Sequence, residues 1–497
     1  MSDEKENADI FSKAPNDLLE EENISSKRSY ILIGISLLLI IIALIIILIF
    51  VFKLNEDEGK TEEIPTDNYP TEEKKQNLIK AKYSIQNELN QIIFYYTFKD
   101  YIEKIKINDI EISLIDNEIK FNKSGIFQIE IKLSKNLTNL DFLFYHCHSL
   151  EEVDLSELKT GEIISSTDTF NGCKNLKKVI LGNFEAKNLS NISNMFSGCE
   201  KLSEVNINSF KYDKLKDIYG LFYNCSELKN INFGEFNTRN VINMSKLFSG
   251  CTSLKQINLN QAKNFKTENV IDMSYMFQYC KNLENLNLNN LDTSKVIHMN
   301  NMFDSCENLI NLQINSFNTK NVENMFYMFT NCSKLESIDL NNFDTSNVID
   351  MFGMFKDCKN LKNLKIDSFK TSKVIDMGEM FGNCVNLDNL NLLNFDVKNV
   401  ESMIGMFEKC SKLTSLDISN FETDKLEEAS FFLDNCPQLK YLDLRKFNTK
   451  KLKYFDNFFD LNANNVTLIY NKNLFNLTIP SNWKKEDINI KNKYFFE

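Results

Sequence analysis

The stretch NNFDTSNVIDMFGMFKDCKNLKNLKIDSFKTSKVIDMGEMFGNC, from Asn341 to Cys384, contains nearly two copies of the unit that decides the fold. The same unit recurs on both sides of this stretch, and all twelve cysteines of the chain lie in its register: Cys147, Cys173, Cys199, Cys225, Cys251, Cys280, Cys306, Cys332, Cys358, Cys384, Cys410 and Cys436. Ten of the intervals between them are 26 residues long, and the interval from Cys251 to Cys280 is 29. A fixed period of this length is typical of a solenoid.

Each unit has two halves with different periodicity. The first half, C-x-x-L-x-x-I-x-L in residues 332–340, ends in an alternation of apolar and polar residues, which predicts a short, half-buried strand. The second half, T-x-x-V-x-x-M-x-x-M-F in residues 345–355, places apolar residues three or four apart. We interpret this spacing as one stripe of a short helix that the threonine or the following serine caps. Such a helix is too short to be stable alone, so the coils must stabilise one another.

One column of aromatic residues recurs in the unit and is expected to form a spine between coils. It lies eleven residues after each cysteine, allowing for the longer repeat, and comprises Phe184, Phe210, Phe236, Phe265, Phe317, Phe343, Phe369, Phe395, Phe421 and Phe447, with Leu158 and Leu291 in its two gaps. The fold class predicted from these patterns is α/β, a leucine-rich-repeat solenoid of about 12 coils with β-rich caps. Each coil is expected to combine one short parallel strand and one short helix.

The N-terminal part of the chain predicts a membrane anchor. Residues 1–29 are polar and mostly acidic, and we expect them to be a disordered cytoplasmic tail. Tyr30–Phe52 is an uncharged run of 23 residues, long enough for a transmembrane helix, which needs about 20. The run is too long and begins too late for a cleaved signal peptide, the alternative interpretation. Lys27 and Arg28 precede it, so the positive-inside rule predicts a type II single-pass protein of the plasma membrane with an extracellular C-terminal part.

The remaining boundaries follow from composition. Residues 53–76 are acidic and predict a solvated stalk. Residues 77–140 should form an N-terminal cap, with a helix over about 77–98 and β-strands between 101 and 133, because an open solenoid end would expose core. The solenoid itself is expected over residues 141–462, and a C-terminal cap over 463–497. The additional residues Gln261–Lys263 are either a tolerated bulge or a feature that contributes to specificity.

Composition and motifs point away from catalysis. The net charge of −12 argues against nucleic acid as a partner, and the chain has only three histidines. We find no phosphate loop and no nucleophile–histidine–acid constellation, so we expect a protein that is not an enzyme and that has no cofactor or metal. His146-Cys147-His148 could suggest a metal site, but the spacing matches no known zinc pattern, and Cys147 is simply the first register cysteine.

The cysteine column has two interpretations. Outside the cell, an even number of cysteines suggests disulfides. However, each cysteine would have two nearly equivalent neighbours, one in each adjacent coil, and nothing in the sequence selects a pairing. Cysteine also serves as a small buried apolar residue. We therefore favour buried free thiols, and we interpret the methionine column in the same way, as core filler rather than a soft-metal site.

The units between Asn341 and Cys384 resemble the repeats of BspA-like leucine-rich-repeat surface proteins. The motif that carries the resemblance is Phe-x-Thr-x-x-Val-x-x-Met-x-x-Met-Phe-x-x-Cys, which recurs nearly whole several times over residues 140–460. The resemblance implies a surface-displayed solenoid that binds or adheres to an extracellular protein or glycan. It provides no fixed ligand residues. The alternatives are a structural surface coat without a specific ligand and a membrane scaffold that faces the cytosol.

The candidate ligand-binding residues lie on the outward side of the predicted strands, which is rich in amides and poor in aromatic residues. They are Asn258, Asn260, Asn285, Asn287, Asn289, Asn311, Gln313, Asn315, Asp339 and Asn341. This face is either a hydrogen-bonding platform or simply a solvated surface. N-x-S/T acceptors permit N-glycosylation at Asn122, Asn136, Asn188, Asn191, Asn243, Asn465 and Asn476. Asn224 and Asn331 also match, but they directly precede column cysteines, where a glycan would be hard to accommodate.

Overall fold

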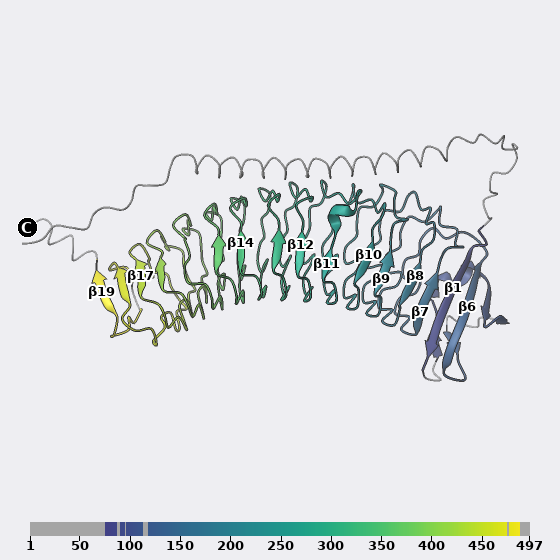
Figure 1. The fold of residues 1–497 in the computed structure, drawn as a ribbon, viewed down its shortest axis with the longest axis horizontal. Helices are drawn as coiled ribbons and strands as arrows, with labels where there is room; N and C mark the ends of the chain where they lie inside the picture. Colours follow the sequence, from purple (N-terminus) through teal and green to yellow (C-terminus); the bar gives the residue numbers. More distant parts are fainter. Residues whose placement is uncertain (1–74, 87–89, 95, 113–117, 475–476, 488–497) are drawn as a thin grey trace, which may run out of the picture. The chain divides into compact units, whose positions relative to one another are not determined.

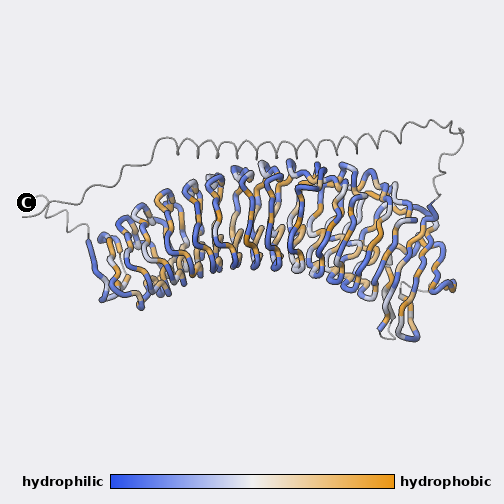
Figure 2. Tube along the Cα trace, in the orientation of Figure 1, coloured by the Kyte–Doolittle hydropathy of each residue, from blue (hydrophilic) through white to orange (hydrophobic). Residues whose placement is uncertain are grey.

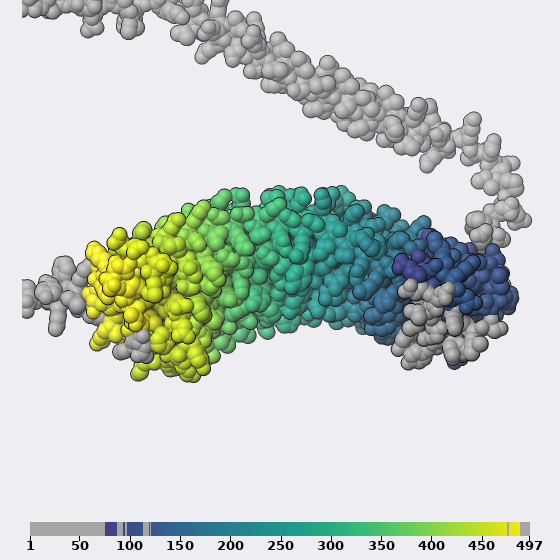
Figure 3. Space-filling view, turned by 90° about the horizontal axis from the view of Figure 1, so that it is seen from below, coloured from purple at the N-terminus to yellow at the C-terminus, as the bar shows by residue number. Residues whose placement is uncertain are grey.

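The computed structural model describes residues 75–86, 90–94, 96–112, 118–474 and 477–487. The chain divides into two compact units, residues 1–74 and 75–497, and all the described residues belong to the second. In this unit the coils follow one another in sequence order, as the ribbon and the space-filling view both show (Figures 1 and 3).

An antiparallel sheet closes the N-terminal end of the solenoid. It contains β1 (Leu78–Ile85), β3 (Ile102–Ile107), β4 (Ile110–Ile112) and β6 (Gly125–Leu133). The strand order β4-β3-β6-β1-β7-β8 joins this cap to the first solenoid strands. The strands predicted between residues 101 and 133 are therefore confirmed. A separate pair is formed by β2 (Asn90–Ile92) and β5 (Glu118–Lys120).

The helix expected over residues 77–98 is wrong. Residues 78–85 form β1, in which Ile79, Ala81, Tyr83 and Ile85 are buried and Lys80 is exposed. This is a period of two, which fits a strand and not a helix. Among the described residues of this segment and its surroundings, the helical piece is the short 3-10 helix η1 (Tyr96–Tyr101).

The strand predicted in the first half of each unit is confirmed in eleven coils. It spans two to five residues, begins three to five residues after the column cysteine and pairs in parallel with the strand of at least one adjacent coil (Figure 1). The strands are β7 (Leu150–Asp154), β8 (Lys178–Ile180), β9 (Glu204–Asn206), β10 (Asn230–Asn232), β11 (Gln256–Ile257), β12 (Asn285–Asn287), β13 (Asn311–Gln313), β14 (Ser337–Asp339), β15 (Asn363–Lys365), β16 (Ser415–Asp417) and β17 (Tyr441–Leu444).

The helix predicted in the second half of each unit is wrong, because this half consists of consecutive turns. Within one coil, the N–H of Met354 donates to the carbonyl of Met351 at 3.2 Å, three residues earlier. Between coils, the N–H of Met351 donates to the carbonyl of Asp376 at 3.0 Å, and that of Phe355 to Met380 at 2.9 Å. The backbone groups that an α-helix would pair internally are thus bonded to the next coil. The structure is a β-solenoid.

Left-handed residues explain why a helix cannot form there. Two positions in most coils have positive φ, five residues and one residue before the cysteine; in one coil these are Gly353 (φ 60°) and Asp357 (φ 60°). A right-handed helix cannot include such residues. Thr345, predicted as a cap, is buried and instead bonds the next coil: its Oγ1 donates to the carbonyl of Lys370 at 3.0 Å and accepts from the N–H of Lys370 at 2.7 Å.

The core is built from columns of identical residues, and the hydropathy colouring shows apolar positions recurring from coil to coil (Figure 2). The predicted phenylalanine column is buried, but its rings stack only in places, such as Phe317 on Phe343 with centroids 6.4 Å apart. The continuous stack is the column three residues before the cysteines. There Phe329 lies 5.5 Å from Phe355 at an interplanar angle of 4°. Each such pair contributes about 0.5–1.5 kcal/mol beyond burial.

The C-terminal cap is formed by β18 (Thr467–Tyr470) and β19 (Lys484–Asp487), which extend the sheet of β16 and β17. Trp483 is buried there and its Nε1 donates to the carbonyl of Ala463 at 3.0 Å. The expected transmembrane helix is not found in the described part of the chain, where no helix is long and apolar enough to cross a membrane. The predicted span, residues 30–52, and the predicted tail and stalk at residues 1–29 and 53–74 lie outside the described residues.

Candidate functional site

The outward side of the strands, here called the strand face, carries the ten residues predicted to bind a ligand. In β12, Leu286 points into the core while Asn285 is exposed and Asn287 is half-exposed. The same alternation places Asn311 and Gln313 of β13 outward. Nine of the ten are exposed and Asn287 is half-exposed. The outward position of the residues in the strands is therefore as expected, whereas Asn260 lies in the 3-10 helix η2 (Leu259–Gln261). Binding of a ligand by the ten residues remains a prediction.

Most of these side chains form an uncharged surface over neighbouring coils, here called the amide patch: Asn258, Asn260, Asn285, Asn287, Asn289, Asn311, Gln313 and Asn315. Strand pairing places Asn285 beside Asn311, and Asn287 beside Gln313. Only part of the hydrogen-bonding capacity is used internally. The amide of Asn311 donates to Oδ1 of Asn285 at 2.6 Å, and Oδ1 of Asn287 accepts from the N–H of Asn289 at 3.0 Å. The remaining donors and acceptors face solvent, so the patch can bind polar backbone or side-chain groups.

Charged pairs begin where the amide patch ends. Asp339 of β14 accepts from the ammonium of Lys365 at 3.0 Å and from the N–H of Asn341 at 3.1 Å. The hydrogen bond from Lys365 first, and then that from Asn341, holds the pKa of Asp339 below its ordinary value. Lys362 and Glu336 form a similar exposed pair at 3.2 Å. These charges neutralise each other and, being exposed, contribute little stability. Asp339 and Asn341 thus differ from the other eight predicted residues.

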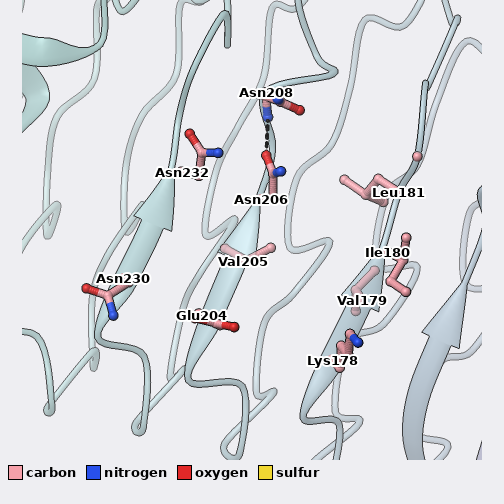
Figure 4. Close-up of a pocket in the computed structure, with 11 residues that line it drawn as sticks. Lys178, Val179, Ile180, Leu181, Glu204, Val205, Asn206, Asn208, Asn230 and Asn232 are labelled. Atoms are coloured by element: carbon pink, nitrogen blue, oxygen red, sulfur yellow. Dashed lines mark hydrogen bonds between the residues drawn. The ribbon is translucent and has the colours of Figure 1, made fainter.

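A hollow of about 470 Å³ lies on the strand face over β8, β9 and β10, on the N-terminal side of the amide patch (Figure 4). Val179, Ile180 and Leu181 line one side of it and Asn230 and Asn232 the other, as the close-up shows. Asn206 lies on the strand between them. Figure 4 also shows the hydrogen bond from the N–H of Asn208 to Oδ1 of Asn206, which is 3.1 Å long. The hollow therefore combines apolar and amide surface.

Sequence reasoning missed this hollow, although one signal was present. Gly182 occupies the position nine residues after the cysteine where asparagine often stands, as at Asn208 and Asn289. Its φ is +61°, and a Cβ there would lie 2.6 Å from Cα of Ser156. Glycine at this position is therefore required by the close approach of two coils, and the absence of a side chain leaves the surface open. The replacement of asparagine by glycine in this column is the sequence signal that could have revealed the hollow.

A second hollow, of about 360 Å³, adjoins the insertion between Cys251 and Cys280. Its lining includes Ile231, Asn258 and Gln261. The longer repeat forms a single 3-10 turn, η2 (Leu259–Gln261), drawn as a coiled ribbon in Figure 1. Ala262, the residue that follows it, is buried. The longer repeat is thus accommodated as a local bulge beside the amide patch. Its contribution to specificity, the second interpretation of the sequence, stays a prediction.

All twelve cysteines are buried free thiols. From the second coil onward, each Sγ donates to the carbonyl of the stacked phenylalanine in the preceding coil; for example, Cys332 donates to Phe303 at 3.2 Å. Burial raises the pKa of Cys280 and of Cys358 to about 12. These thiols are structural, because a reactive thiol needs a lowered pKa and access to solvent.

His146, Cys147 and His148 do not converge on one point. Cys147 is buried in the core, whereas the two imidazole rings lie 5.4 Å apart outside it and His146 is exposed. Nδ1 of His148 lies 2.8 Å from the carbonyl oxygen of Gly172. Burial, and then the charge of His148, lowers the pKa of His146. Among the residues that the structure describes, no group of three or more histidine, cysteine or acidic side chains could hold a metal ion.

The N-glycosylation acceptors are distributed over several faces. Asn122, Asn188 and Asn465 are exposed, whereas Asn136, Asn191 and Asn243 are half-buried. Asn476 lies outside the described residues. Asn224 is exposed and Asn331 half-buried, and both have positive φ. Glycosylation itself remains a prediction.

Two protein families match the chain. The family described as "Mycoplasma protein of unknown function, DUF285" matches residues 138–262, 253–365 and 353–471. The family described as "BspA type Leucine rich repeat region (6 copies)" matches residues 76–183. No curated protein matches the chain.

Solved structures of similar proteins share low sequence identity with this chain. A leucine-rich-repeat protein of Bacteroides ovatus is 18% identical, with a TM-score of 0.40, over 76% of this chain and 90% of that one. A leucine-rich-repeat protein of Leptospira interrogans is 15% identical, with a TM-score of 0.22, over 68% of this chain and 92% of that one. The functional domain of InlJ from Listeria monocytogenes, described as including a cysteine ladder, is 12% identical, with a TM-score of 0.16, over 63% and 69% of the two chains.

Proposed function

The chain belongs to the BspA-like leucine-rich-repeat family and to the family of DUF285 proteins, and from this premise we propose that it is a surface protein that binds an extracellular protein through its strand face. The solenoid supports this proposal because stacked repeats present one continuous surface built from the same position in successive coils. The function is binding rather than catalysis.

The amide patch is the observation that carries the proposal. It is exposed and uncharged over adjacent coils, whereas the coils after it place oppositely charged side chains beside each other, as in Asp339 and Lys365. An uncharged surface costs less to desolvate than one of ion pairs. Because the patch lacks aromatic side chains, which dominate tight interfaces, we propose binding of modest affinity through many hydrogen bonds.

The decisive experiment replaces Asn287, Asn289, Gln313 and Asn315 together by lysine. Four lysines on adjacent strands repel one another and remove amide acceptors, so we expect binding of the purified protein to immobilised extracellular-matrix and cell-surface proteins to fall at least tenfold. Binding that is unchanged in this variant would reject the amide patch as the site.

The chain itself offers a matched control. In a column on another part of each coil, asparagine alternates with lysine, as at Lys295, Lys373 and Lys425. The four-lysine control variant therefore changes the asparagines of this column: Asn240, Asn321, Asn347 and Asn399. It carries the same added charge on another part of the coil. Each of these asparagines donates a hydrogen bond to a carbonyl of the preceding coil, so circular dichroism must first show that the variant folds. If both variants lose binding equally, charge alone is responsible and the strand face is not the site.

Display outside the cell is part of the proposal and needs its own test. We propose that an antibody reaches a C-terminal tag on intact, unpermeabilised cells. Access only after permeabilisation would place the solenoid in the cytosol or in an internal lumen, and would favour a scaffold over a surface binding protein.

A further inference from the structure

A second surface, distinct from the strand face, carries the aromatic side chains that the amide patch lacks. It consists of the exposed side chains of the six residues before each column cysteine, here called the turn face. The composition of these positions differs from coil to coil: Gly250 and Asn194 are small or amide residues, whereas other coils place Tyr327 or Glu379 there. In the coils that end at Cys225, Cys251 and Cys280, they hold Tyr219, Tyr223, Lys246 and Tyr275, here called the tyrosine–lysine cluster.

The cluster centres on the ammonium group of Lys246. Its Nζ lies 5.5 Å from the ring centroid of Tyr219, 5.6 Å from that of Tyr223 and 5.4 Å from that of Tyr275. Lys246 and the three tyrosines are each half-buried. Each contact within about 6 Å is a favourable cation–π interaction, so the rings hold the ammonium in one place.

Lys246 differs from most half-buried cations in this chain. Lys356 is paired with Glu379 at 2.5 Å and Lys82 with Glu152 at 2.6 Å. Among the described residues, no carboxylate forms an ion pair with Lys246. Its pKa is raised, first by a hydrogen bond with the hydroxyl of Tyr219 and then by the charges of the three tyrosines. A positioned ammonium group among three phenol rings, with one hydroxyl hydrogen-bonded to it, is a cation without a paired anion.

The backbone is strained where it supports the cluster. Lys246 has φ +57° and Tyr275 has φ +61°, and the next cluster neighbour, Tyr279, has φ +58° and is 45% exposed. Glycine or asparagine would adopt this conformation at lower cost, and asparagine does so at the equivalent positions Asn194 and Asn301. The same positions have positive φ in most coils, so this conformation belongs to the coil architecture, and the cluster is distinguished by its side chains.

From this arrangement we infer that the tyrosine–lysine cluster is a binding site for an acidic sugar, with its carboxylate or sulfate oxygens on Lys246 and the tyrosine hydroxyls. The C–H-lined face of a sugar ring is apolar and suits the aromatic rings, whose faces carry partial negative charge. Exposed Asn224, adjacent to Tyr223, can pair with sugar hydroxyls. One ammonium group accommodates one acidic group, so the site fits a terminal sugar.

An acidic protein segment fits the site less well. The protein carries a net charge of −12, so it repels polyanionic chains at long range. The rings are half-buried and leave no deep pocket for an anchoring side chain of the kind that dominates protein interfaces. Binding of an acidic peptide is therefore an outcome that the experiment must be able to detect.

The test is isothermal titration calorimetry of the full-length protein with sialyllactose, which carries a carboxylate, sulfated lactose, which carries a sulfate ester, and uncharged lactose. We expect saturable binding of sialyllactose, sulfated lactose or both, at least tenfold tighter than lactose. The Lys246→Asn variant, which installs the residue found at the equivalent positions Asn194 and Asn301, should lose this preference, and Lys246→Arg should keep it. Tyr275→Asn should weaken binding at least threefold.

Two controls make the result interpretable. Lys216→Asn removes one positive charge from the exposed surface of an adjacent coil and should leave acidic-sugar binding unchanged. The four-lysine variant of the amide patch should also leave it unchanged, so this proposal and the proposed strand-face function can fail independently. Equal affinity for lactose and both acidic sugars, no binding of any of them, or binding of a glutamate-rich peptide in their place would overturn the inference. Equal loss in Lys246→Asn and Lys216→Asn would also do so.

Discussion

At the scale of the residue, the position directly before each cysteine determines what the second half of a coil can be. It has positive φ in every coil that the column cysteines define, whether the residue is Gly198, Asn331 or Asp357. The high frequency of glycine, asparagine and aspartate at this position was visible in the sequence, and it favours a left-handed turn. Helical spacing alone therefore gave the wrong prediction, because it ignored this column.

The cysteines support a prediction about thiol chemistry. All twelve should be unreactive toward a thiol reagent in the folded protein and all twelve should react after denaturation without reductant, because they are buried and free. The measurement is a spectrophotometric thiol titration. Fewer reactive thiols in denaturant would reveal disulfides, and fast reaction in the native state would show that the column is accessible.

The same thiols make stability depend on pH. Burial raises the pKa of Cys280 and Cys358 to about 12. A cysteine in the unfolded chain has a pKa of about 8.5. Above that pH the unfolded state releases protons that the folded state keeps. The free energy of unfolding should therefore be constant below about pH 8.5 and fall as the pH rises toward the folded pKa. Urea unfolding at a series of pH values tests this; stability that rises in that range would contradict it.

At the scale of the element, the spacing of apolar residues was ambiguous. Thr345, Val348, Met351 and Met354 are separated by exact steps of three, whereas a helical stripe advances by an average of about 3.6 residues. Steps of three match turns closed by bonds from residue i+3 to residue i, such as that from the N–H of Val348 to the carbonyl of Thr345, at 3.0 Å. The strand in the first half was easier to predict, because alternation with a period of two fits a strand and neither a helix nor a series of turns.

The threonine column tests the turn architecture. In Thr345→Val the side chain keeps its shape, but the N–H and carbonyl of Lys370 lose their hydrogen-bonding partner in a buried position. We expect a loss of about 1–3 kcal/mol in the free energy of unfolding, the usual cost of unsatisfied buried polar groups. Urea unfolding provides the measurement. Thr138→Val, at an exposed threonine, is the control, and an equal small effect in both variants would argue against the inter-coil bond.

At the scale of the whole molecule, the repeat register could be read from the sequence, but its surfaces could not. The cysteine period identified the solenoid, its number of coils and the outward position of the amide patch. The hollow beside Gly182 and the tyrosine–lysine cluster were missed. The first depends on the close approach of two coils, and the second on side chains that were assigned to a helix. Both features depend on how neighbouring repeats pack against each other, and the residue pattern within one repeat does not predict this packing.

The ends of the solenoid should unfold before its middle. Trp483, the single tryptophan, lies in the C-terminal cap against Phe459, with ring centroids 5.0 Å apart. A terminal coil has a neighbour on one side only, so it is less stable than an internal coil. Tryptophan fluorescence should therefore report unfolding at a lower urea concentration than the far-UV circular dichroism of the whole chain. Coincident transitions would show that the solenoid unfolds as one cooperative unit.

The central claim is that each coil is a short strand followed by turns, because the strand face and the turn face both depend on it. Far-UV circular dichroism of the full-length protein tests this claim most directly. A β-solenoid predicts a spectrum dominated by strand and turn, without strong helical minima. Helical minima as strong as a helix in every coil would give would contradict the account. The turn face, on which the tyrosine–lysine cluster lies, would then not exist as described.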